Sequence, residues 1–143
     1  AVLQALAARN LERVLDRTIA AIHDPANETW LPAMGAASDV LVDAFRTEAG
    51  FRGLRVGDVL DLRPATTERT FNSMVADRIL DALIERFGFA DSVELRQRFE
   101  VAVEIADALT TRAFARDARG DEAFLAASRE VVASLLAQEL DRG

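Results

Sequence analysis

The stretch RFEVAVEIADALTTRAFAR, residues 98–116, decides the fold because it has a helical period and is apolar over an unusually wide arc. At 100° per residue, one apolar stripe contains Leu95, Phe99, Ala102, Ala106, Leu109 and Ala113. Ile105 widens this stripe on one side, and Val103 and Phe114 widen it on the other. A helix that lies on a single core needs an apolar stripe of roughly 100°. One core therefore leaves part of this helix to be covered by something else.

The rest of the chain shows the same helical period. Long helices are predicted at Ala1–Ile22, at Thr29–Ala49, from Thr66 or Thr67 to Phe87, from Asp91 or Ser92 to Gly120, and from Asp121 onward. A short helical turn is expected around Phe51–Leu54. Since no alternating strand pattern and no repeat of fixed period occur, the sequence predicts an all-α protein. The expected architecture is an antiparallel bundle of five long helices plus the short turn.

The composition is typical of one globular domain, residues 1–143. Hydrophobic residues make up 50% of the chain and charged residues 29%. No apolar run reaches the roughly 18 residues of a membrane-spanning helix, and there is no cysteine. The net charge of −7 argues against nucleic acid binding by this chain alone, because phosphate binding needs concentrated positive charge. We expect a cytoplasmic domain that does not bind a membrane.

Residues suited to catalysis are few. The one histidine, His23, lies at a predicted helix end, where capping of free carbonyl groups is the favoured interpretation. Glu100, Glu104 and Asp107 share a helix face, as carboxylates do in di-iron bundles, but no histidine follows a glutamate by three residues. Because they lie opposite the apolar stripe, a solvated acidic face is favoured. We predict no catalytic residue, no metal site and no cofactor.

Large apolar side chains on three predicted helices suggest either an ordinary core or the lining of a pocket. They are Trp30, Met34, Phe45, Phe71, Met74 and Phe99. Residues of this kind build both, so the sequence leaves the two alternatives open. Arg78 lies at the centre of an apolar helix face, where a lone charge is costly. It is either paired with an acid on a neighbouring helix or available to a polar group of a ligand.

Four segments together resemble the C-terminal effector domain of TetR-type transcriptional regulators. They are AVLQALAARNLERVLDRTIAAI, DAFRTEAGFRGL, ADRILDALIERFG and FEVAVEIADALTTRAFARDARGDEAFLAASREVVASLLAQEL. The resemblance implies that the first segment is the helix linking a DNA-binding half to the effector half. The opening residues have a helical pattern without a capping Ser, Thr, Asp or Asn. We therefore expect that the chain begins within a longer protein, and that its helix-turn-helix half is missing here.

The resemblance also implies what covers the wide stripe. In the family, the last two long helices pair with the same two helices of a second subunit, so that one surface patch meets itself. We expect a homodimer with the interface residues Ala102, Ala106, Leu109, Ala113, Phe124, Val131, Val132 and Leu135. The helical wheel leaves open which part of the stripe meets the partner and which part faces a pocket.

The ligand implied by the resemblance is a small apolar molecule bound between the first four long helices. The expected ligand-binding residues are Trp30, Met34, Phe45, Phe71, Met74, Arg78, Phe99 and Val103, with Asn72 and Thr110 as further polar candidates. Binding would favour one arrangement of the linking helix and so change the spacing of two DNA-binding heads. The expected function is ligand sensing and dimerisation for a transcriptional regulator. The alternatives are a ligand-free dimerisation module and a helical-bundle enzyme.

Overall fold

Five α-helices make up most of the described chain. The computed structural model describes residues 2–47 and 71–142. The helices are α1 (Val2–His23), α2 (Trp30–Thr47), α4 (Phe71–Phe87), α5 (Val93–Arg116) and α6 (Glu122–Arg142). No strand occurs within those two ranges. The predicted all-α class and five long helices are confirmed, whereas the turn predicted around Phe51–Leu54 and the cap at Thr66 or Thr67 lie outside the described residues.

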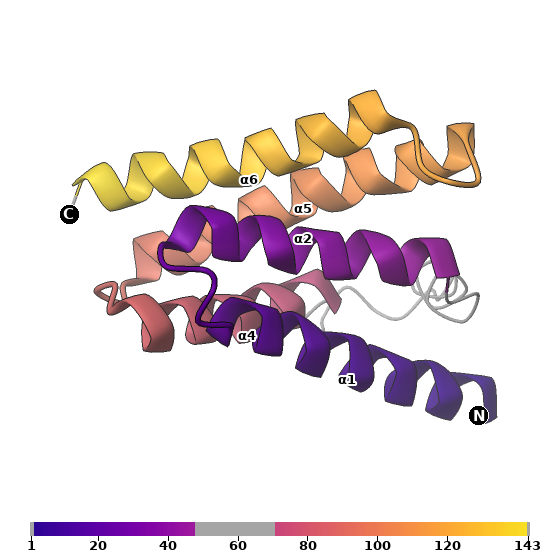
Figure 1. Ribbon diagram of the computed structural model, residues 1–143, viewed down its shortest axis with the longest axis horizontal. Coiled ribbons are helices and arrows are strands. Elements are labelled where there is room, and N and C mark those ends of the chain that lie inside the picture. Colours follow the sequence, from indigo (N-terminus) through magenta and orange to yellow (C-terminus); the bar gives the residue numbers. More distant parts are fainter. Residues whose placement is uncertain (1, 48–70, 143) are drawn as a thin grey trace.

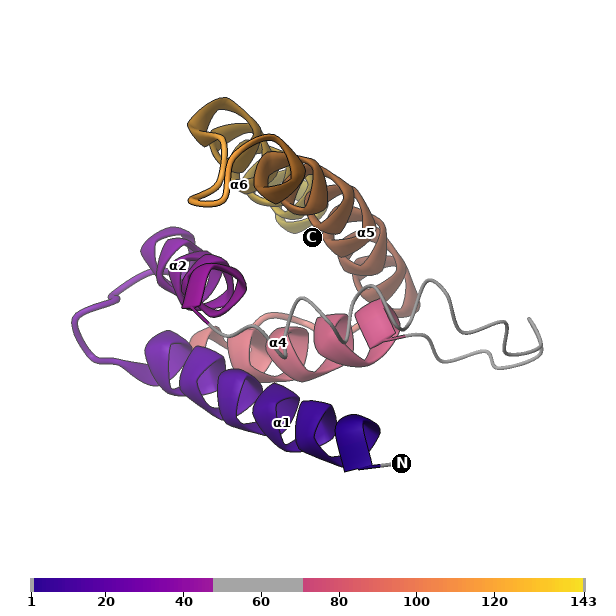
Figure 2. The same ribbon diagram turned by 90° about the vertical axis from the view of Figure 1, so that its right-hand side faces the viewer.

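The helices enclose a large apolar core, and a smaller buried cluster of Val14, Ala44 and Phe45 lies between α1 and α2. α5 and α6 form an antiparallel pair, and α1 lies beside α4 on the opposite side of the core (Figure 1). In Figure 2, α2 lies on the flank between α1 and α6. Each helix sends at least one fully buried side chain into the core: Ile22, Ala37, Leu83, Phe99 and Leu136. No helix within the described ranges is long and apolar enough to cross a membrane.

Local hydrogen bonds set the bounds of α5. Its N-cap is Ser92, whose hydroxyl oxygen accepts a hydrogen bond from the Leu95 N–H at 3.0 Å, as predicted. The helix ends at Arg116 and not at Gly120, which corrects the sequence prediction. The backbone is already extended at Asp117, and the turn that follows is closed by hydrogen bonds to the Ala113 carbonyl. The chain can therefore reverse within a few residues and begin α6.

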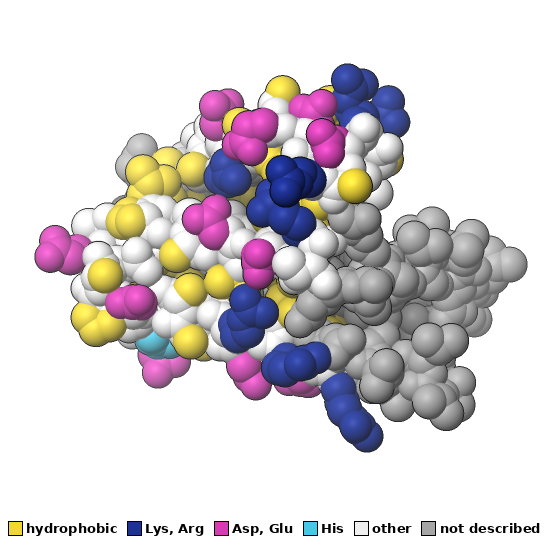
Figure 3. Space-filling model, turned by 45° about the vertical axis from the view of Figure 1, so that its right-hand side comes forward, with side chains coloured by type: hydrophobic (Ala, Val, Ile, Leu, Met, Phe, Trp, Pro, Cys, Tyr) yellow, Lys and Arg dark blue, Asp and Glu magenta, His cyan; other side chains and the backbone are white. Residues whose placement is uncertain are grey.

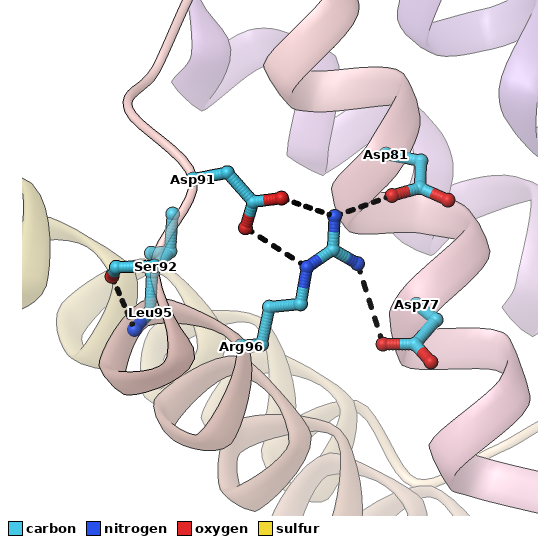
Figure 4. Close-up of polar contacts among 6 residues, drawn as sticks. All are labelled: Asp77, Asp81, Asp91, Ser92, Leu95 and Arg96. Atoms are coloured by element: carbon cyan, nitrogen blue, oxygen red, sulfur yellow. Dashed lines mark hydrogen bonds and ion pairs between the residues drawn. The ribbon is translucent and has the colours of Figure 1, made fainter.

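An ion-pair cluster around Arg96 joins α4 to α5 (Figure 4). The guanidinium group lies 2.6 Å from Asp81, 2.9 Å from Asp91 and 3.4 Å from Asp77. The hydrogen bonds from Arg96 lower the pKa of Asp91, and the same bonds, together with those to Asp81, raise the pKa of Arg96. The cluster fixes the position of the first turns of α5 against α4.

The wide apolar stripe of α5 has two different environments. On one side, Phe114 stacks on Phe45 of α2, with ring centroids 5.5 Å apart, and Val103 is half-buried. On the other side, Val101 is 45% exposed and Ile105 is 40% exposed. The chain's own core therefore covers the centre and one flank of the stripe and leaves the other flank open to solvent.

Candidate ligand-binding site

A cavity of about 100 Å³ lies between the helices, and all five helices line it. Its walls are mainly apolar. The apolar lining includes Leu11 of α1, Leu41 and Phe45 of α2, Ile79 of α4, Phe99 and Val103 of α5, and Leu125 and Val132 of α6. The sequence predicts that the first four long helices line this site, and the structure adds α6 to them.

Polar side chains line part of the cavity between α4, α5 and α6. The Asn72 amide donates a hydrogen bond of 3.1 Å to the Asp107 carboxylate. The Ser128 hydroxyl donates to the Ala106 carbonyl at 3.3 Å and lies 3.4 Å from the Thr110 hydroxyl. These groups give an apolar cavity a few fixed hydrogen-bonding positions, the usual composition of a small-molecule site.

Asp107 differs from the sequence interpretation. The sequence predicts it on a solvated acidic face with Glu100 and Glu104, but in the structure it is half-buried and lines the cavity. Glu100 and Glu104 are exposed, as expected. The helical wheel puts Asp107 far from the centre of the stripe, and it becomes part of the cavity only because α4 and Asn72 pack against that flank.

The structure brings together half of the residues expected to bind a ligand. Met34, Phe45, Phe99 and Val103 line the cavity, together with the polar candidates Asn72 and Thr110. Trp30 lies in a separate hollow with Phe89, Leu95 and Leu140, and Met74 is 48% exposed. The side chain of Phe71 lies outside the described part of the chain.

Arg78 points away from the apolar cavity. Its guanidinium group forms ion pairs of 3.6 Å with Glu12 and with Asp16, both on α1. The alternative of an ion pair with a neighbouring helix is therefore confirmed. A hollow of about 330 Å³ beside Arg78 is lined largely by charged residues, including Asp77 and Arg96, so it does not suit the small apolar ligand that was expected.

Several cavity residues were not identified from the sequence. They are Leu11, Ser38, Leu41, Val42, Val75, Ile79, Leu125, Ser128 and Arg129. Leu125, Ser128 and Val132 share one side of α6 at helical spacing, a signal visible in the sequence. That spacing shows that the side is buried, but it does not say that it faces an open space.

The residues expected at a dimer interface have different exposures. Ala102, Ala113 and Val132 are buried in the chain's own core, with relative exposures of 0%, 0% and 6%. Ala106 is half-buried and lines the cavity. The remaining residues of that set, all half-buried, are Leu109, Phe124, Val131 and Leu135. The three buried residues offer almost no surface to a second subunit.

The described residues contain no group of three or more His, Cys, Asp or Glu side chains placed to hold a metal ion. His23 is half-buried at the last position of α1, where it is the basic residue of the final turn. A positive or hydrogen-bonding side chain at this end of a helix complements the free carbonyl groups.

Comparison with known proteins places this fold in a family. The family model for tetracyclin repressor-like C-terminal domains matches residues 28–140. A crystal structure of a TetR-family transcriptional regulator from Streptomyces coelicolor is 29% identical, with a TM-score of 0.75 over 95% of this chain and 69% of that chain. A search of curated proteins gives no match. Since the family model matches more than half of the residues, the chain belongs to the tetracyclin repressor-like C-terminal domain family.

Proposed function

We propose that this chain is the ligand-sensing and dimerisation domain of a TetR-like transcriptional regulator and that it has no catalytic activity. The observation that carries the proposal is the apolar cavity lined by all five helices. Few polar groups lie in its wall, and those present have fixed partners. A small apolar molecule suits such a space, because burial of its surface drives binding and the polar groups select its orientation.

A ligand in the cavity would contact α1 directly. Leu11 lines the cavity, and the next residue, Glu12, is paired with Arg78 of α4. A ligand that fits better when α1 takes one position shifts the chain toward that position, by its difference in affinity for the two states. If α1 continues toward a helix-turn-helix half, as the family resemblance implies, this movement changes the spacing of two DNA-binding heads.

The volume of the cavity limits what it accepts without movement. About 100 Å³ is less than the roughly 300–1,000 Å³ of ligand pockets for drug-sized molecules. An engineered apolar cavity of about 150 Å³ binds benzene. We therefore propose that a small apolar ligand fits the cavity as it stands and that a larger one binds when neighbouring helices move apart.

Dimerisation is proposed through the outer side of the α5–α6 pair. On this side, the Arg98 side chain donates a hydrogen bond of 2.8 Å to the Gln138 side chain and so joins α5 to α6. Val101 and Ile105 of α5 are 45% and 40% exposed, and Val131 and Leu135 of α6 are half-buried. These four residues form one apolar strip along the two helices, which we call the α5–α6 strip. A second copy of the strip can cover it around a twofold axis.

A neutral dye tests the proposed ligand site. We expect the chain to bind N-phenyl-1-naphthylamine with a rise in fluorescence, and we expect the Ala106→Leu substitution to abolish binding by filling the cavity. The matched control is Ala108→Leu, because Ala108 is exposed on the same helix. Chemical unfolding shows whether both variants remain folded. Equal dye binding by the two variants would contradict the cavity as the ligand site.

The second candidate function, a dimerisation module without a ligand, makes a different prediction. In that case no small apolar molecule raises the melting temperature of the chain, because nothing binds the folded state preferentially. The cavity favours the ligand-sensing function, and a screen of apolar compounds by thermal shift separates the two.

A further inference from the structure

The cavity shares one wall with a groove on the molecular surface between α2 and α6. Met34, Ser38, Arg129 and Val132 line both spaces. The groove has a volume of about 320 Å³ and extends over apolar residues such as Leu31. These four side chains form the wall between the candidate ligand site and the groove. Met34 is the flexible member of that layer, since its unbranched side chain adapts readily to a new neighbour.

Arg129 has an incomplete set of partners at this shared wall. Its Nε is buried and has no hydrogen-bond partner. Its ion pairs are long, 3.7 Å from Nε to Asp39 and 3.5 Å from Nη1 to Glu122. Charge-assisted hydrogen bonds of this kind are usually about 2.7–2.9 Å. Because a buried donor without a partner costs free energy, a ligand acceptor at this position would be favoured.

The charges of the lining direct an anionic group to one side. Among the described residues that line the cavity, Arg129 is the one with positive charge and Asp107 the one with negative charge. The Asp107 carboxylate already accepts a hydrogen bond from Asn72 and repels a second anion. An anionic group therefore belongs beside Arg129, with the apolar part of the ligand over Phe99 and Val103.

An ion pair at this shared wall joins α6 to α2. Arg129 of α6 pairs with Asp39 of α2, and in Figure 3 arginine and acidic side chains lie close together along the boundary between α6 and α2. A carboxylate that binds Arg129 competes with Asp39 and so weakens this link. Separation of the two helices would join cavity and groove into one longer apolar site.

We propose that the ligand is an apolar carboxylate that enters between α2 and α6, places its apolar body in the cavity and binds Arg129 through its carboxylate. The inference rests on the proposed ligand-sensing function and adds the chemical class of the ligand. The planar guanidinium group of arginine can bind both oxygens of a carboxylate, which a neutral head group cannot match.

Decanoate and 1-decanol test the proposal because they have the same alkyl chain and differ in the head group. Each is used to displace N-phenyl-1-naphthylamine from the chain. We expect decanoate to displace the dye at a concentration about tenfold lower than 1-decanol, the effect of one added charge-assisted hydrogen bond. Arg129→Met should abolish this preference, so that decanoate and 1-decanol displace the dye at the same concentration.

Arg98→Met is the matched control. The Nε of Arg98 is also buried without a hydrogen-bond partner, but Arg98 lies on α5 outside the cavity lining. This variant should keep the preference for decanoate. Equal displacement by the two compounds in the unaltered chain, or a preference that survives Arg129→Met, would overturn the carboxylate proposal and leave the proposed function standing. If the unaltered chain binds neither dye nor decanoate nor 1-decanol, both proposals fail.

Discussion

Gly120 shows how one residue determines where two helices meet. Its φ of +92° lies in the left-handed region that side chains disfavour, and a Cβ built on it would lie 2.8 Å from Leu125 Cδ1 and 3.1 Å from Phe114 Cζ. Leu125 is 1% exposed, and Phe114 is stacked on Phe45, so both neighbours are packed against other side chains. The tight turn between α5 and α6 therefore needs glycine for two reasons, backbone conformation and space.

We predict that Gly120→Ala lowers the free energy of unfolding by about 2 to 3 kcal/mol, the sum of left-handed strain and overpacking. The matched control is Gly88→Ala. Gly88 also has a positive φ, +73°, but a Cβ there meets nothing within 4 Å, so only the strain of about 1 kcal/mol applies. Urea denaturation measures both. Equal losses would show that Leu125 and Phe114 give way to the added methyl group.

Asp91 gives a prediction about acid stability at the residue scale. The hydrogen bonds from Arg96 lower the pKa of Asp91 in the folded chain. A carboxyl group with a lowered folded pKa stabilises the fold above its unfolded pKa of about 4, and this contribution is lost as the pH falls through the folded value. We therefore expect Asp91→Asn to destabilise the chain at neutral pH and to have little effect at the acid end.

Urea unfolding between pH 3 and pH 7 checks this prediction for Asp91. The control is Glu100→Gln, which removes an exposed carboxylate from the middle of α5. The difference between the unaltered chain and Asp91→Asn should shrink as the pH falls, whereas the Glu100→Gln difference should change less. A difference for Asp91→Asn that stays constant with pH would contradict a stabilising ion pair with Arg96.

At the scale of elements, α5 connects the candidate ligand site with the exposed surface of the molecule. Its two flanks meet different surroundings: Val103 and Asp107 face the cavity, while Val101 and Ile105 face solvent. An apolar flank that the chain leaves exposed favours an interaction with another surface. The proposed partner is a second copy of the same strip.

We predict that Ile105→Glu weakens dimerisation by about 100-fold or more, because an unpaired carboxylate would be buried at the centre of the α5–α6 strip. Light scattering after size-exclusion chromatography measures the mass. The matched control is Val93→Glu, since Val93 is 79% exposed at the first position of α5. A dimer that tolerates Ile105→Glu would place the interface elsewhere.

At the scale of the whole molecule, the cavity connects the parts that a sensor needs. α1 contributes Leu11, α2 and α6 form the wall shared with the groove, and α5 carries both a cavity wall and the exposed strip. A ligand in this position touches the link to α1 and the pair of helices proposed for dimerisation. A ligand can therefore favour one arrangement of two subunits over another only if the shape of the cavity differs between those arrangements.

Much of the local structure could be predicted because it depends on neighbours in the sequence. Ser92 caps α5 through a hydrogen bond to a residue three positions later, and Asp121 accepts a hydrogen bond from the Ala123 N–H at the start of α6. Apolar residues at helical spacing predicted five helices, and their buried faces contain Phe99, Leu83 and Leu136 as expected for a core.

The same reasoning failed at one helix end and at residues whose surroundings depend on distant contacts. The sequence predicts the end of this helix at Gly120, but the Ala113 carbonyl accepts hydrogen bonds from the turn, and α5 ends at Arg116. Trp30 and Met74 have the composition of pocket residues, yet packing directs them to a separate hollow and to solvent. Helical spacing gives the angle of a side chain around its own axis and contains no information on which helix lies opposite.

The sequence by itself determined the helical class, the number of long helices and most of their ends, because capping and apolar period act within a few residues. Only the tertiary structure decided that Asp107 and Arg129 face a cavity, that Arg78 pairs with α1, and that Val101 and Ile105 stay exposed. The physical reason is that these outcomes depend on how five helices share one core. Contacts between helices far apart in the sequence set that arrangement, and the pattern of a single helix does not contain them.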